Sequence, residues 1–223
     1  MQDSHVSVVI PTFNRADTLV RAVRSALEQT HERVTVHVVD DGSTDDTARV
    51  IEPWRADPRL DYTYQENRGQ SAARNVGIAR AEGDFVAFLD SDNYWLPNKL
   101  SDQLAYLARY PDHQIVYSDG HVIDEHDRRL PAGRVRRYSG DIVSHLVQGN
   151  FVGNNTAMAR RECFEAMGGF DEDLRVSEDY DLWLRFSTRY RFLHHPEPVA
   201  CYCVAGPRLS NNHKKVLAAN FLI

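Results

Sequence analysis

The sequence has few cysteines, and their spacing argues against disulfide bonds. Among 223 residues only three are present, Cys163, Cys201 and Cys203. The last two stand two apart in an apparent strand, where Cα atoms lie roughly 7 Å apart and are badly placed for a disulfide. No second cysteine pair accompanies them, so a zinc site is not expected either. We expect buried thiols and no covalent cross-link.

The chain also lacks a long apolar run and an excess of basic residues. No stretch approaches the roughly 20 apolar residues needed to span a bilayer. Residues 1–5 lead directly into a strand-like run, which leaves no room for a targeting segment. A formal net charge of −6 disfavours nucleic-acid binding, which usually needs a basic face. We expect a cytoplasmic protein with no nucleic-acid partner, and the sequence leaves its oligomeric state open.

The remaining composition fits a folded α/β protein. Hydrophobic residues make up 42% and charged residues 26% of the chain, as in ordinary globular proteins. No Gly/Ser/Pro linker divides the sequence, so we expect a single domain over residues 1–223. Strand, polar edge motif and helix then repeat along the first half. This repetition predicts an α/β fold of Rossmann-like type, with a mostly parallel central sheet flanked by helices.

The stretch 83–93 is a short apolar run that ends in two carboxylates separated by one serine. If the extended conformation continues to its end, Asp90 and Asp92 project to the same side, at the sheet edge where such folds bind ligands. Hard oxygen donors suit Mg²⁺ or Mn²⁺, and Mg²⁺ usually takes only one or two carboxylates besides water and phosphate oxygens. A phosphate-bearing substrate is indicated. The bland alternative is that both acids are turn and cap residues before Pro97.

Two further strands end in polar motifs. The loop 11–15 follows the first strand at a position where open sheets bind ligands. Asp41 follows the second strand and could accept an N–H of a nucleobase, although turn chemistry alone would also explain it. Arg74 lies one turn into a helix expected over residues 71–81, close enough to the edge to reach a phosphate. A surface position would explain that arginine equally well.

The second half offers a basic loop and an acidic helix start. Residues 121–138 contain five arginines, which are either solvated surface or a grip on an anionic acceptor, a phospholipid head group or a nucleotide diphosphate. Farther on, Ser177 is typical of an N-cap, with Glu178 and Asp179 in the first helical turn. A carboxylate there could instead take a proton from an acceptor hydroxyl. The residues alone leave this choice open.

Six motifs together resemble the family 2 glycosyltransferases, which have the type-A nucleotide-diphospho-sugar transferase fold. In order they are Val8-Val9-Ile10-Pro11-Thr12-Phe13-Asn14-Arg15, Val38-Val39-Asp40-Asp41-Gly42-Ser43, Gly69-Gln70-Ser71-Ala72-Ala73-Arg74-Asn75, Leu89-Asp90-Ser91-Asp92, Gly168-Gly169-Phe170 and Glu178-Asp179-Tyr180-Asp181-Leu182-Trp183-Leu184-Arg185. The resemblance covers almost the whole chain. It implies an inverting, metal-dependent enzyme that moves a sugar from a nucleotide-diphospho-sugar, with uridine or thymidine diphosphate favoured, to a hydroxyl of a carbohydrate or glycoconjugate acceptor. Polysaccharide, cell-surface glycan or glycoconjugate synthesis would be the setting, with a peripheral association at the inner membrane face compatible with it.

The resemblance also implies a role for each matching position. The nucleotide-binding residues would be Pro11, Thr12, Asn14, Arg15, Asp41, Arg74, Asp90 and Ser91. Asp92, with Asp90 nearby, would hold Mn²⁺ or Mg²⁺, and Asp179 would be the catalytic base with Glu178 beside it. The acceptor-binding candidates are Asn154, Asn155 and Trp183. Residues 1–118 would then form the nucleotide-sugar-binding half and residues 119–223 the acceptor-binding half.

The sequence departs from the family pattern at two positions and leaves two other functions to consider. Ala205 stands where a histidine is usual, and Asn93 where a third acid is frequent, which puts the strength of metal binding in doubt. A nucleotide-sugar-binding protein that has lost transfer would fit the missing histidine, but the retained Glu178 and Asp179 argue against it. A nucleotidyltransferase would normally show a Gly-rich basic loop after its first strand, and the loop 11–15 is not of that kind.

Overall fold

The computed structural model describes residues 3–131 and 136–204, and its strands form one mixed sheet. The eight strands lie in the order β3-β2-β1-β4-β7-β6-β8-β5. Pairs β1–β2, β1–β4, β2–β3 and β6–β8 are parallel, whereas β7 runs antiparallel to both β4 and β6, and β5 to β8. The strands are β1 (Val6–Thr12), β2 (Val34–Asp40), β3 (Leu60–Tyr64), β4 (Phe85–Phe88), β5 (Tyr94–Trp95), β6 (Ile115–Ile123), β7 (Met158–Arg160) and β8 (Phe192–Cys203). The expected α/β fold with a mostly parallel sheet is confirmed.

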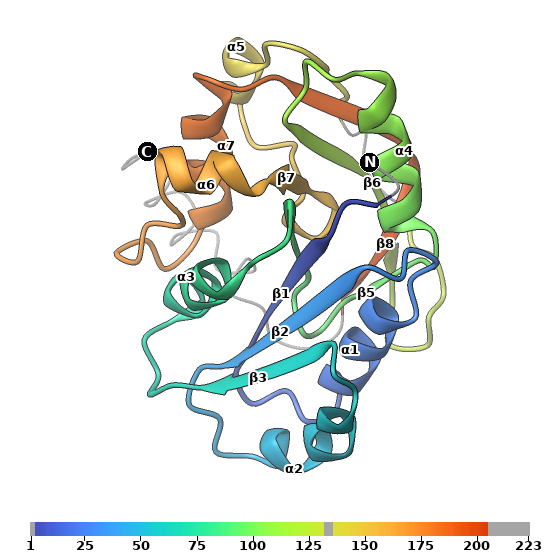
Figure 1. Ribbon diagram of the computed structural model, residues 1–223, viewed down its shortest axis with the longest axis vertical. Coiled ribbons are helices and arrows are strands. Elements are labelled where there is room, and N and C mark those ends of the chain that lie inside the picture. The colour runs from blue at the N-terminus through green and yellow to red at the C-terminus, as the bar shows by residue number, and fades with distance from the viewer. Residues whose placement is uncertain (1–2, 132–135, 205–223) are drawn as a thin grey trace.

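Helices cover both faces of this sheet (Figure 1). On one face lie α1 (Leu19–Leu27) and α4 (Lys99–Arg109), and on the other lie α3 (Gln70–Arg80), α6 (Arg161–Met167) and α7 (Glu178–Ser187). The short elements are α2 (Thr47–Ile51), α5 (Val143–Leu146) and the 3₁₀ helices η1 (Glu52–Ala56) and η2 (Asn154–Thr156). The sheet is therefore buried on both sides, as expected of a parallel sheet.

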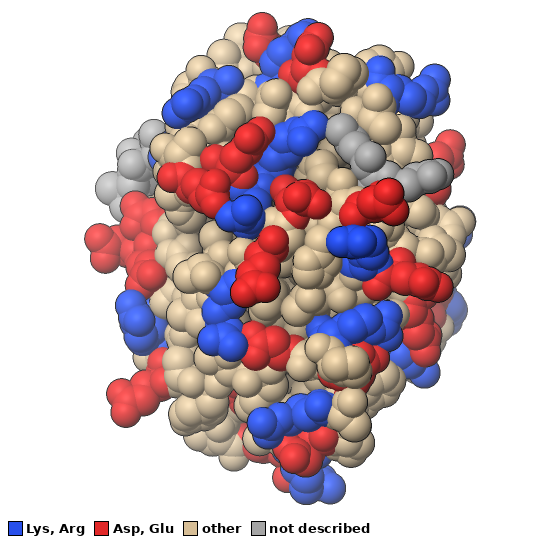
Figure 2. Space-filling view, in the orientation of Figure 1, with Lys and Arg blue, Asp and Glu red and all other residues tan. Residues whose placement is uncertain are grey.

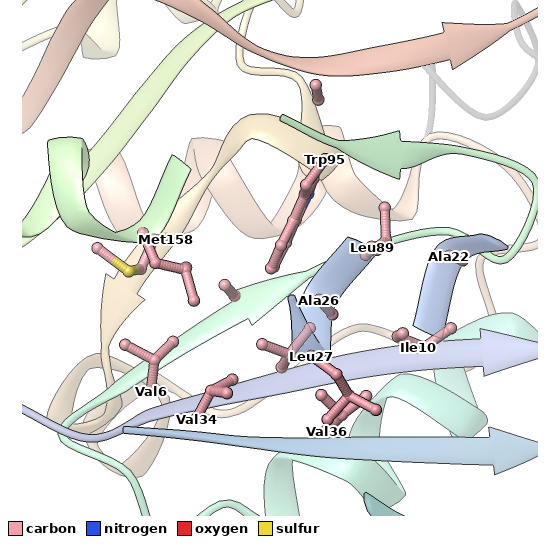
Figure 3. Packing of buried hydrophobic residues seen from close by; sticks show 14 of the residues in the cluster. Val6, Ile10, Ala22, Ala26, Leu27, Val34, Val36, Leu89, Trp95 and Met158 are labelled. Carbon is pink, nitrogen blue, oxygen red and sulfur yellow. The ribbon is translucent and has the colours of Figure 1, made fainter. Parts of the chain in front are cut away.

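Alternation along β1 divides the apolar core into two clusters. Val6, Val8 and Ile10 belong to the cluster with α1 and α4, whereas Val9 belongs to the cluster with α6 and α7. Successive side chains of a strand point to opposite faces, so one β-branched run supplies both clusters. Figure 3 shows part of the first cluster, in which Val6 of β1 lies beside Val34 of β2 and Ile10 lies near Ala22 of α1.

Two local predictions are wrong. Strand β4 ends at Phe88, and the chain then turns, with the N–H of Asn93 donating to the carbonyl of Asp90 at 3.0 Å. The extended conformation therefore does not carry Asp90 and Asp92 to the same side by alternation. Ser177 precedes α7 but makes no side-chain capping bond, because its backbone is left-handed, with φ 61° and ψ 19°. It is not the expected N-cap of the usual extended geometry.

Acidic and basic side chains mix on the surface. Figure 2 shows both signs interspersed over the face that is oriented as in Figure 1. Exposed ion pairs account for part of this mixing, such as Arg80 with Asp61 at 2.6 Å and Arg49 with Asp46 at 2.7 Å. Such exposed pairs contribute little to stability, because water and salt screen the attraction.

Within residues 3–131 and 136–204, no helix is both long and apolar enough to cross a membrane. Some expectations lie outside the described residues. They are the substitution at Ala205 and residues 132–135 of the arginine-rich segment.

Gly77 lets helix α3 approach strand β1 unusually closely. A Cβ at Gly77 would lie 2.4 Å from Cγ1 and 2.9 Å from Cγ2 of Val9. No side chain larger than hydrogen fits this gap without a shift of the helix or the strand. Gly77 stands almost one helical turn after Arg74, so the same contact seats Arg74 against the sheet edge.

We predict that Gly77→Ala lowers the free energy of unfolding by about 1–3 kcal/mol through overpacking, although alanine favours helices by about 1 kcal/mol. Urea or thermal unfolding measures the effect. Val9→Ala supplies the matched background, because it removes the two methyl groups that the added methyl of Gly77→Ala would strike. In a double-mutant cycle, Gly77→Ala should therefore lower the free energy of unfolding clearly less in the Val9→Ala background than in the parent. Equal or greater stability of Gly77→Ala alone would contradict the close-packing account.

Candidate active site

The carboxyl ends of β1, β2 and β4 open into one pocket of about 850 Å³. The start of α3, the turn η2 and the loop before α7 complete its wall. A pocket of this size suits a ligand of nucleotide-sugar dimensions. The expected site residues that line it are Pro11, Thr12, Arg15, Asp41, Arg74, Asp90, Ser91, Asp92, Asn154, Asn155, Glu178 and Asp179. Segments far apart in the sequence thus meet in one cavity.

Asn14 is among the expected site residues, but it does not line this pocket. Its φ of 52° is left-handed, and its Oδ1 accepts the N–H of Thr44 at 2.8 Å and of Asp45 at 3.2 Å. Asparagine tolerates this backbone better than most residues. The side chain therefore joins the loop after β1 to the loop after β2, and its expected contact with the nucleoside is corrected to a supporting role.

Trp183 is likewise a core residue and not an acceptor contact. It is fully buried and packs edge-on against Phe88, Phe186 and Phe192. Trp183 lies one turn beyond the acids that open α7, belongs to the apolar core cluster and does not line the pocket. The assignment of Trp183 to acceptor binding is therefore wrong.

Asp41 lies on the pocket wall and is already well bonded. Its carboxylate accepts the N–H groups of Arg68 and Gly69, each at 2.8 Å, and the side chain of Gln65 at 2.7 Å. The loop comes this close because Gly42 has φ +83°, and a Cβ there would meet the backbone N of Asn67 at 2.8 Å. A carboxylate offers about four acceptor sites, so one remains for a ligand N–H.

Arg74 is buried between two carboxylates. Its Nη2 donates to Asp90 Oδ1 at 2.7 Å and its Nη1 to Glu178 Oε1 at 2.6 Å, while Phe170 lies under the guanidinium. Only 3% of the arginine is exposed, so the alternative of a surface arginine is wrong. Burial opposes the positive charge, but attraction by Asp90 and Glu178 outweighs it and raises the pKa of Arg74. The ion bridge ties the end of β4 to the start of α7.

Asn155 fixes Asp90 from the other side. Its Oδ1 accepts the backbone N–H of Asp90 at 2.6 Å, and its Nδ2 donates to Asp90 Oδ2 at 2.7 Å. Asn155 is 3% exposed. Both oxygens of Asp90 are therefore engaged, and Asn155 acts on this carboxylate as well as on the pocket wall.

The two acids that open α7 have different surroundings. Glu178 is buried and receives a second bond from Gln70 Nε2 at 2.6 Å. Asp179 is half-buried, and its Oδ2 lies 3.4 Å from Nδ2 of Asn150. Desolvation, followed by the charge of Glu178, raises the pKa of Asp179 to about 7. A carboxyl poised near neutrality can take up a proton, as a general base must.

Asp92 is the better placed metal ligand of the two aspartates after β4. It lines the pocket, and its Oδ2 lies 3.9 Å from Arg15 Nη2. Across the described ranges no group of three or more His, Cys, Asp or Glu side chains could hold a metal. One or two carboxylates nevertheless suit Mg²⁺ or Mn²⁺ when substrate phosphates supply further oxygens. The donor set at Asp92 and Asp90 therefore fits such an ion.

Sequence reasoning missed several pocket residues. Phe13 lines the pocket with 46% of its surface exposed, and Arg68, Arg175 and Tyr202 line it as well. Phe13 and Gln70 stood inside the quoted motifs, where an exposed aromatic and an amide beside a glycine were available signals. Nothing local marks Arg175, because its place depends on the loop before α7 and on its bond to the carbonyl of Arg68 at 3.0 Å.

Comparison with sequences of known proteins gives a clear relationship. Residues 7–168 match the profile of "Glycosyl transferase family 2". An "Uncharacterized glycosyltransferase" of Rickettsia bellii is 34% identical over 85% of this chain and 27% of its own length. The "Succinoglycan biosynthesis protein ExoU" of Rhizobium meliloti is 33% identical over 95% of this chain and 65% of its own. The chain thus spans less than two thirds of the length of these two relatives.

Solved structures share the fold. The crystal structure of S. aureus TarS residues 1–349 in complex with UDP-GlcNAc has a TM-score of 0.80, with 22% identity over 93% of this chain and 61% of that one. A mannosyltransferase from Pyrobaculum calidifontis in complex with GDP-Man and Mn²⁺ has a TM-score of 0.75, with 21% identity over 98% of this chain and 63% of that one. The motifs, the fold and the profile agree, and the chain belongs to glycosyl transferase family 2.

Proposed function

We propose that this protein is an inverting glycosyltransferase that uses a uridine or thymidine diphospho-sugar and a carbohydrate or glycoconjugate hydroxyl in polysaccharide synthesis. The observation that carries the proposal is that one pocket collects a base-reading candidate, Asp41, a metal-ligand candidate, Asp92, and a base candidate, Asp179. They follow β2, follow β4 and open α7, respectively. In support, one relative is named for succinoglycan biosynthesis and one similar structure contains UDP-GlcNAc.

The donor would bind along the edge of the first three parallel strands. Asp41 retains acceptor capacity for the N3–H of uracil or thymine. The buried hydroxyl of Thr12 has no hydrogen-bond partner among the described residues, and it lines the same wall. Phe13 offers an exposed ring at the pocket, on which a base could stack. Residues up to 118 would thus supply most of the donor side, and η2 and α7 would supply much of the acceptor side.

Asp92, with Asp90 beside it, would hold Mn²⁺ or Mg²⁺. The ion would neutralise charge on the leaving diphosphate. Arg15, Arg68 and Arg175 line the same pocket and can contribute positive charge from the protein itself. Arginine suits this role, because its planar fork of donors matches phosphate oxygens. The diphosphate would therefore lie between the ion at Asp92 and these three arginines.

Asp179 would perform the proton transfer. The acceptor oxygen attacks the anomeric carbon, the bond from that carbon to the diphosphate oxygen breaks, and the hydroxyl proton passes to an Asp179 oxygen. Attack opposite to the leaving group inverts the anomeric configuration. Glu178 accepts bonds from Arg74 and Gln70 at its Oε1, so we give it the role of orienting the start of α7 beside the base. The raised pKa of Asp179 favours a working base over a lapsed binding protein.

We expect the base of the nucleotide to be selected by Asp41. Calorimetry with UDP, dTDP, GDP and ADP should give the tightest binding for UDP or dTDP, because adenine offers no matching ring N–H. Asp41→Asn should weaken UDP roughly 10-fold or more, since a hydrogen bond to a charged group contributes about 1.5–3 kcal/mol. ADP serves as the control, and its affinity should barely change. Tightest binding by ADP would refute this role.

Binding of the diphosphate should depend on a divalent cation. We expect UDP to bind at least about tenfold more tightly in millimolar Mn²⁺ than in EDTA, because the ion offsets the carboxylates that face the phosphates. Asp92→Ala should abolish this difference, and Asp102→Ala, at an acid on α4 outside the pocket, is the control. Equal affinity of the parent protein under both conditions would sink the metal assignment.

Asp179→Asn should abolish transfer without harming the fold. Loss of a general base lowers rate by roughly 10²–10⁴-fold. Transfer by the parent should rise with pH and level off above about pH 7, where Asp179 is ionised. Because the folded-state pKa is raised, the folded protein binds more protons than the unfolded chain between about pH 4 and 7. The free energy of unfolding contributed by Asp179 therefore falls as pH rises through this window.

The asparagine variant should consequently melt no lower than the parent at pH 8 and should keep its affinity for UDP. A helix-dipole role would instead predict a lower melting temperature and nearly normal transfer. Asp181→Asn, in the same helical turn, is the matched control. Transfer within a fewfold of the parent would show that the base lies elsewhere.

A further inference from the structure

Lys99 is a buried charge that the proposed chemistry does not use. It opens helix α4, is 1% exposed and does not line the pocket. Its Nζ donates to Gln103 Oε1 at 2.8 Å and lies 4.3 Å from the centre of the Trp95 ring. No carboxylate forms an ion pair with it within residues 3–131 and 136–204. An ammonium group buried among neutral partners is costly.

Both partners of Lys99 hold the same turn. Trp95 Nε1 donates to the carbonyl of Asn155 at 2.8 Å, and Gln103 Nε2 donates to the carbonyl of Thr156 at 2.7 Å. These are consecutive carbonyls of the turn η2. Figure 3 shows Trp95 directed into the apolar cluster between Leu89 and Met158, so its ring has a fixed seat. Lys99 thus contacts the two side chains that fix the backbone of this turn.

The turn η2 fixes the carboxylate of Asp90 in the pocket. Asn155 bonds both the backbone N–H and the Oδ2 of Asp90, at 2.6 and 2.7 Å. A shift of η2 would be passed to Asp90 through these two short bonds. Arg74 bonds Oδ1 of Asp90, whereas Oδ2 is bonded by Asn155. The position of Oδ2 therefore depends on the position of η2.

We propose that Lys99 is a positioning residue, which holds η2 through Gln103 and Trp95 and thereby orients Asp90 for the metal-bound diphosphate. The inference rests on the proposed function. It adds a residue outside the pocket, Lys99, that holds a pocket residue, Asp90, in place. A purely structural lysine would be replaceable by an apolar side chain of similar length. Such replacement of a buried charge is often neutral or stabilising. Burial lowers the pKa of Lys99 to about 7, in keeping with that cost.

The test compares Lys99→Met with the parent in two measurements. Hydrogen exchange of the Asp90 amide should become roughly tenfold faster or more, because its bond to Asn155 is loosened, while amides in β1 stay protected. Affinity for UDP in Mn²⁺ should fall roughly tenfold, with little change in EDTA, because Asp90 acts only where the metal binds. A merely structural role would lower both affinities alike.

Gln29→Met is the matched control. Gln29 is 5% exposed and also supports α4, through a bond from Leu100 N–H to its Oε1 at 3.1 Å, but it does not touch η2. Its replacement should leave both the Asp90 amide and UDP affinity near parental values. Trp95→Phe keeps a ring beside Lys99 and removes the donor to Asn155, so it should reproduce the effects of Lys99→Met. If Lys99→Met does not fold, Lys99→Gln is measured by the same readouts, because Trp95→Phe reports on the bond of Trp95 to η2 and not on Lys99 itself.

Asp90 exchange within twofold of the parent in the folded Lys99 variant would overturn the proposal, whatever Trp95→Phe does. Failure of the parent to bind UDP would instead count against the proposed function. The exchange comparison does not depend on a ligand, so the two failures are distinguishable.

Discussion

The buried ion bridge of Arg74 with Asp90 and Glu178 is the interaction on which the site depends. Through Arg74 it joins the end of β4 to the start of α7. Arg74 and Glu178 are 104 positions apart in the sequence. Removal of one partner from such a bridge typically costs about 3–5 kcal/mol, since it leaves a buried charge unpaired. Gly77, almost one helical turn after Arg74, lets α3 lie close against β1. The pocket geometry is therefore a consequence of backbone packing as much as of charge.

Much of the architecture could be predicted from local patterns. The β-branched runs before Pro11 and Asp40 predicted strands at the right places, because side-chain period and turn residues are local signals. The motifs at strand ends also predicted which residues share the pocket. Parallel strands bring their carboxyl ends to one edge whatever their separation in the chain, so this juxtaposition follows from topology alone.

Contacts between distant side chains could not be predicted in this way. Trp183 looked available beside two acids, but the face that a helix buries depends on its tertiary partners, here Phe88 and Phe192. Asn155 was expected to contact an acceptor, but both its amide oxygen and its amide nitrogen form hydrogen bonds with Asp90. The turn after Phe88 shows the same limit. An apolar strand pattern indicates where a strand lies but not the residue at which it turns, and a one-residue difference reverses the side to which a side chain points.

The excess of carboxylates in the pocket explains why an anionic donor would need a bound metal ion. Six carboxylates and four arginines line the cavity, the acids being Asp41, Asp90, Asp92, Glu172, Glu178 and Asp179 and the arginines Arg15, Arg68, Arg74 and Arg175. Arg74 is already committed to Asp90 and Glu178, and the rest of the wall still carries four acids against three arginines. An anionic donor would be repelled from such a wall. A divalent cation at Asp92 would reverse the local sign, and partial protonation of Asp179, whose pKa is raised, would reduce the remaining repulsion. Under the proposed function, donor binding and the readiness of the base would thus be coupled through the same set of carboxylates.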